Sequence, residues 1–206
     1  MHLAFIGMSG IGKSHWAKQL AQHGWLHLDC DAMIAQRLGE WIDVADDEDP
    51  VHAVGRWMGM PWTPGYAERE AQYLALEREV TSEALDTAAA AQTADRHVVL
   101  DTTGSVIYTG DAPLDRLKSE TRVVYFEAPD SVRDRMVELY LREPKPVLWQ
   151  GGYEPGVDED QSVALGRCYA ELLRRRASRY AALAAVTIGY HAARSDGFDL
   201  LEALPR

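Results

Sequence analysis

Asparagine is absent from this chain, and cysteine occurs only as Cys30 and Cys168. Guanine-specific GTPases recognise their base with an Asn-Lys-x-Asp motif, so a chain without asparagine cannot carry that motif. Two cysteines are too few for a disulfide framework and indicate a reducing compartment. No apolar run approaches the roughly 20 residues of a membrane helix, and the apolar stretch at residues 1–6 is too short for a signal peptide. These absences predict a cytoplasmic protein.

Basic residues are also few relative to acidic ones. The 206 residues include 21 Lys+Arg and 32 Asp+Glu, a formal net charge of −11. A surface this acidic repels phosphate backbones, so we expect no nucleic acid and no membrane as partner. Hydrophobic residues make up 47% and charged residues 26% of the chain, as in ordinary globular proteins. At about 150 residues per domain, the length of 206 favours a single domain over residues 1–206.

Short apolar runs alternate with helical patterns along the chain. Strands are predicted at residues 3–6, 25–28, 97–100, 122–126 and 185–188. Helices are predicted at 13–22, 32–38, 66–91, 130–141, 158–184 and 198–204. This alternation is typical of an α/β protein with a parallel sheet covered on both faces.

Two segments interrupt the alternation. Residues 39–64 carry an acidic cluster and then an aromatic stretch with Gly and Pro, and residues 144–156 form a second loop-like stretch. Loops that leave a regular scaffold often carry function. We expect residues 32–75 to form a helical acceptor-binding insertion and residues 142–158 to form a lid.

Residues 7–14 carry the strongest motif, Gly-Met-Ser-Gly-Ile-Gly-Lys-Ser, which matches G-x-x-x-x-G-K-[ST] in full. Its glycines let consecutive N–H groups point at a triphosphate, and the following helix adds its positive end. Lys13 is predicted to bridge the β- and γ-phosphates of ATP, and the Ser14 hydroxyl to bind Mg²⁺. The expected nucleotide contacts are Gly7, Gly10, Ile11, Gly12, Lys13, Ser14 and, through its N–H group, His15.

A phosphate-binding loop alone does not separate ATPases, GTPases and kinases. Without the guanine motif, and with less chain than large motors or AAA machines need, small kinases fit best. Asp29 and Asp31 follow a predicted strand, at the edge where parallel sheets bind ligands. One carboxylate can serve Mg²⁺ and the other the acceptor hydroxyl, although either could instead cap the next helix. Asp101 ends another apolar run and could hold Mg²⁺ through water.

Beyond the loop and the aspartate pair, several segments of this sequence resemble the shikimate kinase family. They are Tyr73-x-x-x-Glu77, the strand leading to Gly104, the stretch Lys145-Pro146-Val147-Leu148, and Arg176-x-x-x-Tyr180. The resemblance implies a P-loop α/β/α sandwich with a five-stranded parallel sheet in the order 2-3-1-4-5, and a monomer.

The resemblance also implies roles for single residues. It implies that Asp31 holds the acceptor diol and that Arg176 binds a substrate carboxylate. Lys145 stands where the family's lid has an arginine that reaches the phosphates, and Arg135 is the nearest match to the arginine that lies against adenine. The family's triple glycine beside the substrate is here Thr102-Thr103-Gly104.

The departures from the family concern the acceptor. The family motif Phe-Arg-x-x-Glu becomes Tyr73-Leu74-x-x-Glu77, and Leu74 cannot replace the carboxylate-clamping arginine. Candidates to replace it are Arg56, Arg69 and Arg78. The sequence therefore predicts a kinase that transfers phosphate from ATP·Mg²⁺ to a hydroxyl of a small metabolite other than shikimate. Two alternatives remain open: a nucleotide-binding regulatory module derived from a kinase, and a nucleotide-sugar or toxin-type kinase with a larger acceptor.

Overall fold

The computed structural model describes residues 1–206 except 45–47, 49, 93, 144–146 and 206. Within that part of the chain, five parallel strands form one sheet in the order β2-β3-β1-β4-β5. Their bounds are β1 His2–Gly7, β2 Leu26–Asp29, β3 Val98–Asp101, β4 Arg122–Glu127 and β5 Val186–Gly189. The predicted sheet and strand order are confirmed.

The central strands β1 and β3 are buried along their whole length because helices cover both of their sides, and their interiors are apolar. Every residue of β1 and β3 is buried, as expected for a parallel sheet. The register pairs Asp29 with Asp101 and Phe5 with Asp101. The carboxyl ends of β1, β2 and β3 therefore meet at one edge, where the first glycine of the loop and two predicted carboxylates come together.

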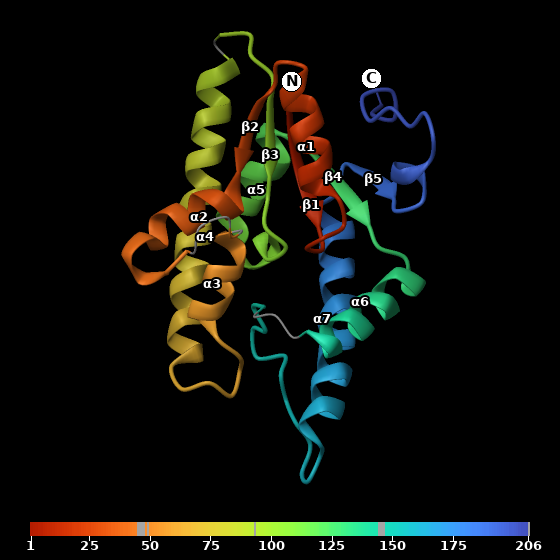
Figure 1. Cartoon of the computed structure of the whole chain (residues 1–206). Helices are drawn as coiled ribbons and strands as arrows, with labels where there is room; N and C mark the ends of the chain where they lie inside the picture. Colours follow the sequence, from red (N-terminus) through yellow and green to blue (C-terminus); the bar gives the residue numbers. More distant parts are fainter. Residues whose placement is uncertain (45–47, 49, 93, 144–146, 206) are drawn as a thin grey trace.

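The helices lie on the two faces as right-handed crossovers require. The β1-to-β2 crossover runs one way along the sheet and the later crossovers run the other way, so α1 lies on one face and α4, α5 and α7 on the other (Figure 1). The helices are α1 Lys13–Gln22, α2 Cys30–Leu38, α3 Pro50–Met58, α4 Tyr66–Gln92, α5 Asp111–Glu120, α6 Asp130–Arg142 and α7 Gln161–Leu183. None of those in the described residues is long and apolar enough to cross a bilayer.

Three segments differ from the sequence prediction. Residues 198–204 form turns instead of a helix. The Asp199 carboxylate accepts from the Leu201 and Glu202 N–H groups at 2.7 and 3.1 Å, as a helix cap would, but Pro205 disfavours a helical conformation at Leu204 and the helix does not develop. Helix α5 was not predicted; its Pro113 lies in the first turn, where a proline is tolerated. The helical pattern predicted at 158–184 begins at Gln161, after the capping residue Asp160.

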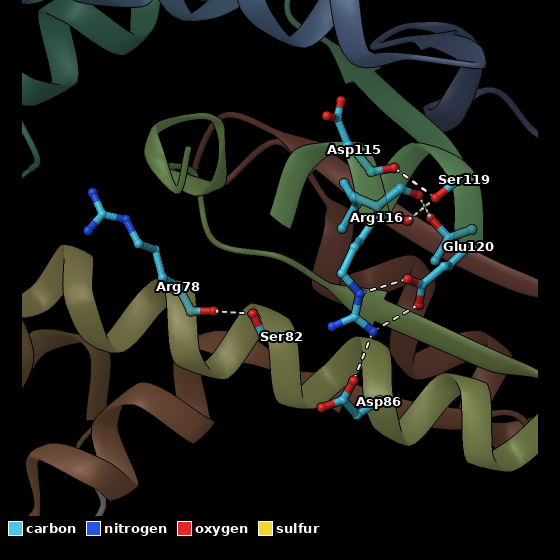
Figure 2. A network of polar contacts seen from close by, with 9 residues as sticks. Arg78, Ser82, Asp86, Asp115, Arg116, Ser119 and Glu120 are labelled. Atoms are coloured by element: carbon cyan, nitrogen blue, oxygen red, sulfur yellow. Dashed lines mark hydrogen bonds and ion pairs between the residues drawn. The ribbon is translucent and has the colours of Figure 1, made fainter. Parts of the chain in front are cut away.

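A polar network holds α5 against the long helix α4 (Figure 2). The Arg116 guanidinium pairs with Glu120 on its own helix at 2.7 Å and with Asp86 on α4 at 2.8 Å. Exposed pairs of this kind contribute about 0–1 kcal/mol each. The network therefore sets how the two helices lie against each other more than it stabilises the fold.

Candidate functional site

The loop between β1 and α1 is built on glycines that no other residue could replace cheaply. Gly7, Gly10 and Gly12 have φ angles of 142°, 75° and 114°, a region that favours glycine. A Cβ on Gly7 would lie 2.7 Å from the Phe126 carbonyl oxygen. The chain can curl beneath a ligand only because these side chains are missing, and α1 then starts at Lys13 with its amino end directed at the loop.

The Lys13 side chain is buried at the centre of this loop. Its ammonium donates to the carbonyl oxygens of Gly7 and Met8, both at 3.2 Å. Burial lowers the pKa of Lys13 below its usual value, while Asp101 and Asp31 act in the opposite direction. A cation held in this loop close to the carboxylates of Asp101 and Asp31 can neutralise charge on a phosphoryl group.

Three potential metal ligands lie beside the loop. Asp29 caps α2, because its Oδ1 accepts the Ala32 N–H at 3.0 Å, so the capping alternative holds for this residue. Its second carboxylate oxygen remains available to a cation. One ligand atom each from His27, Asp29 and Asp101 lies within 4.8 Å of the others. The sequence analysis missed His27, although residues i and i+2 of a strand share a face.

A buried carboxyl group lies beside Thr103, one of the residues predicted to bind the substrate. Glu77 of α4 is fully buried, and its Oε1 accepts from the hydroxyls of Thr103 and of Ser105, the latter at 2.8 Å. Its Oε2 has no hydrogen-bond partner among the described residues. Burial raises the pKa of Glu77 to about 7, the Thr103 and Ser105 hydroxyls oppose the rise, and the Asp31 charge adds to it. The Asp31 carboxylate is thus close enough to influence the protonation of Glu77.

Arg176 of α7 is a buried link between segments. Its Nη1 donates to the Gly104 carbonyl oxygen at 3.2 Å and its Nη2 to the Leu148 carbonyl oxygen at 2.7 Å. The Tyr180 hydroxyl also donates to Gly104. The Nε of Arg176 is buried and has no hydrogen-bond partner in the described chain. The guanidinium therefore ties α7 to the loop after β3 and to Leu148, which lies within the predicted lid.

The predicted site residues do not all face the phosphate-binding loop or one another. The Thr102 hydroxyl donates to the Phe5 carbonyl oxygen at 2.7 Å and so faces β1, whereas Thr103 faces Glu77. Ser14 and His15 are exposed at the start of α1, and Arg135 is exposed on α6. Lys145 lies outside the described residues.

The three arginines considered as a substitute clamp all have local partners. Arg56 pairs with Glu48. Arg69 donates from Nε to the Met58 carbonyl oxygen at 2.9 Å, and Arg78 donates from Nε to the Thr109 carbonyl oxygen at 2.9 Å. Each guanidinium is thus engaged in holding loops of the structure, and none of these contacts singles one out as the clamp.

Part of the predicted lid, residues 147–150, is attached to α4. The Glu70 carboxylate accepts the backbone N–H groups of Trp149 and Gln150 at 2.5 and 3.0 Å, and the Tyr66 hydroxyl donates to the Val147 carbonyl oxygen at 2.7 Å. The Trp149 ring is buried. This attachment was not predicted, because the partners are about 80 residues apart in sequence.

Comparison with known proteins places this geometry in a family. A family model described as an AAA domain matches residues 3–138. The search of curated proteins gives no match. The match to one AAA domain does not test the expectation that this chain is too short to be a large AAA machine.

Among solved structures, shikimate kinases are similar to this chain. The enzyme from Acinetobacter baumannii in complex with shikimate has a TM-score of 0.56 and 23% identity over 91% of this chain and 82% of its own. The enzyme from Bacteroides thetaiotaomicron has a TM-score of 0.59 and 19% identity over 96% and 91%. The enzyme from Aquifex aeolicus has a TM-score of 0.55 and 16% identity over 92% and 87%. At these identities the likeness shows the fold.

Proposed function

The chain belongs to the AAA domain family, and from that premise we propose that it is an ATP-dependent phosphotransferase acting on a hydroxyl of a small metabolite. One observation carries the proposal. The phosphate-binding loop, with Lys13 buried in it, lies at the same sheet edge as the carboxylates of Asp29, Asp31 and Asp101. Phosphoryl transfer needs positioning and charge neutralisation more than covalent chemistry, and this combination supplies both.

On the nucleotide side, backbone N–H groups of the loop hold the phosphates and Lys13 neutralises the group in transfer. Arg135 lies against the adenine, and the lid over residues 142–158, with Lys145, closes on the phosphates. Mg²⁺, when bound, would neutralise part of the negative charge of the phosphates. Its ligands in this proposal are Ser14, Asp29 and Asp101, oxygen donors of the kind that this ion prefers.

On the acceptor side, Asp31 orients the hydroxyl or takes its proton. The insertion over residues 32–75 encloses the acceptor, and Thr103 and Gly104 line it. Thr102 does not contact the acceptor in this proposal. Its hydroxyl donates to the Phe5 carbonyl oxygen and so holds the loop after β3 against β1.

The acceptor carries at most one acidic group in this proposal. Leu74 offers no charge, and the Nη atoms of Arg176 already donate to two carbonyl oxygens. These two bonds use two of the five N–H groups of the guanidinium, and the Nε–H has no partner among the described residues. With a single arginine available, a hydroxylated compound with one carboxylate, or with none, suits this proposal better than a compound with several acidic groups.

The test is transfer of labelled phosphate from ATP·Mg²⁺ into a fractionated metabolite extract. Replacing Lys13 by alanine removes the cation that faces the transferring group, so we expect turnover to fall on the order of a thousandfold. Lys18→Ala, on the exposed side of the same helix, is the matched control and should keep its turnover. A labelled small molecule that appears with the wild type and not with Lys13→Ala names the acceptor. Tight ATP binding without transfer to any fraction would contradict the proposal and favour the regulatory module.

A further inference from the structure

His27, beside the phosphate-binding loop, has a buried ring nitrogen with no hydrogen-bond partner in the described part of the chain. The side chain of His27 is 15% exposed, and its Nε2 is buried without a hydrogen bond among the described residues. The nearest carboxylate oxygen, Oδ2 of Asp101, is 3.6 Å away, beyond the usual 2.7–3.2 Å of an N–H···O bond. Leaving a buried polar group unsatisfied costs about 1–3 kcal/mol, so such a nitrogen requires an explanation.

The strand geometry directs His27 to the two carboxylates. His27 and Asp29 are two residues apart on β2 and so share a face, and Asp101 is the register partner of Asp29 on β3. Their ligand atoms lie within 4.8 Å of one another. Ligands on opposite sides of an ion with bonds of about 2.1 Å are about 4.2 Å apart, so small side-chain rotations close the set around one cation.

The composition of this set matters for the choice of ion. Mg²⁺ is bound almost entirely through oxygen, whereas an imidazole nitrogen gives first-row transition ions an advantage. The Oδ1 of Asp29 accepts the Ala32 N–H and so caps α2, which fixes the orientation of the other carboxylate oxygen. Asp101 is 4% exposed, so its carboxylate gains little from water and more from a cation.

We propose that His27, Asp29 and Asp101 form a divalent-cation site with one nitrogen ligand, which binds Mn²⁺ or a similar first-row transition ion more tightly than Mg²⁺. The inference deepens the proposed function and rests on it, because the same two carboxylates serve the nucleotide's metal there. It adds His27 as a direct ligand and changes the preferred ion.

The test uses the full chain and Mn²⁺ alone as the probe. Pulsed EPR detects the magnetic coupling of a ¹⁴N nucleus to Mn²⁺ when an imidazole binds the ion. We expect ¹⁴N modulation in the wild type and none in His27→Gln. Calorimetry should show Mn²⁺ affinity falling by about tenfold or more in His27→Gln, with Mg²⁺ affinity changing much less. Wild-type protein without ¹⁴N modulation, or with equal affinity for the two ions, would overturn the proposal.

Two further variants keep the result interpretable. His97→Gln removes a histidine that precedes β3, at the opposite edge of the sheet, and should keep the ¹⁴N modulation. His27→Asp replaces the nitrogen by oxygen, so we expect Mn²⁺ binding without ¹⁴N modulation and a smaller preference over Mg²⁺. Circular dichroism of each variant establishes that it folds. Modulation that persists in both His27 variants would exclude His27 as the ligand.

The two proposals fail in different ways. Phosphate transfer with Mg²⁺, together with Mn²⁺ binding that shows no ¹⁴N modulation, would refute the nitrogen ligand and leave the kinase standing. A ¹⁴N-coupled Mn²⁺ site in a chain that transfers phosphate to nothing would support the metal site and refute the kinase.

Discussion

Replacing Glu77 by glutamine removes a carboxyl group that the fold holds away from water. The group is fully buried, Ser105 and Thr103 donate to its Oε1, and Asp31 is near enough to disfavour a second negative charge. Its pKa rises from 4.5 to about 7, chiefly through burial. Glutamine has nearly the same shape and stays neutral at every pH, so Glu77→Gln isolates the effect of ionisation.

The sign of the effect follows from proton binding. Between pH 4.5 and 7 the folded chain holds a proton on Glu77 that the unfolded chain releases. The free energy of unfolding therefore falls as pH rises through this window. A shift from 4.5 to about 7 corresponds to about 3 kcal/mol in total. The wild type should lose that much stability relative to Glu77→Gln between pH 4 and pH 8.

The measurement is urea denaturation of both proteins at half-unit steps from pH 4 to pH 8.5. Subtracting the two curves cancels the titration of groups that the proteins share, and a different fit of the amide gives only a constant offset. Glu79→Gln, an exposed carboxylate on the same helix, measures what loss of a surface charge does. A difference between wild type and Glu77→Gln that stays flat across pH would refute the reasoning.

Three further predictions concern separate parts of the site. Asp31→Asn should lower turnover at least about a hundredfold and change ATP affinity little, because Asp31 acts on the acceptor; comparable losses in both, measured by kinetics and nucleotide titration, would contradict that role. Gly7→Ala should destabilise the fold by several kcal/mol, since its Cβ would lie 2.7 Å from a carbonyl oxygen, and thermal unfolding checks this. Glu70→Gln should weaken the hold on residues 147–150, so backbone amide exchange should accelerate at Trp149 and Gln150; unchanged exchange there would show that the Trp149 ring holds the segment unaided.

The parts of the fold that depend on local sequence could be predicted. The buried strands and the phosphate-binding loop are continuous stretches whose side chains determine the local conformation, as the loop glycines do at residues 7–12. The order of the strands came from the family resemblance instead, because no local pattern specifies which strands pair.

The parts that depend on distant partners could not be predicted. Nothing in the sequence near Arg176 indicates that two carbonyl oxygens from separate loops occupy its Nη atoms. Thr102 and Thr103 are chemically alike, and only the register of β3 against β1 turns one toward Phe5 and the other toward Glu77. Lys145 stays a prediction from the resemblance.

Arg176 has a structural role as well as its proposed role in substrate binding, and this restricts how the protein could acquire a new substrate. Its guanidinium holds the Gly104 and Leu148 segments together, and in the proposed function it also binds the acceptor. A change at this position would lower the free energy of unfolding before any benefit in recognition could be selected. Leu74 makes no hydrogen bond of this kind, but it is buried in the hydrophobic core, so a change there costs packing as well. An evolved or engineered enzyme with a new acceptor would then keep this arginine.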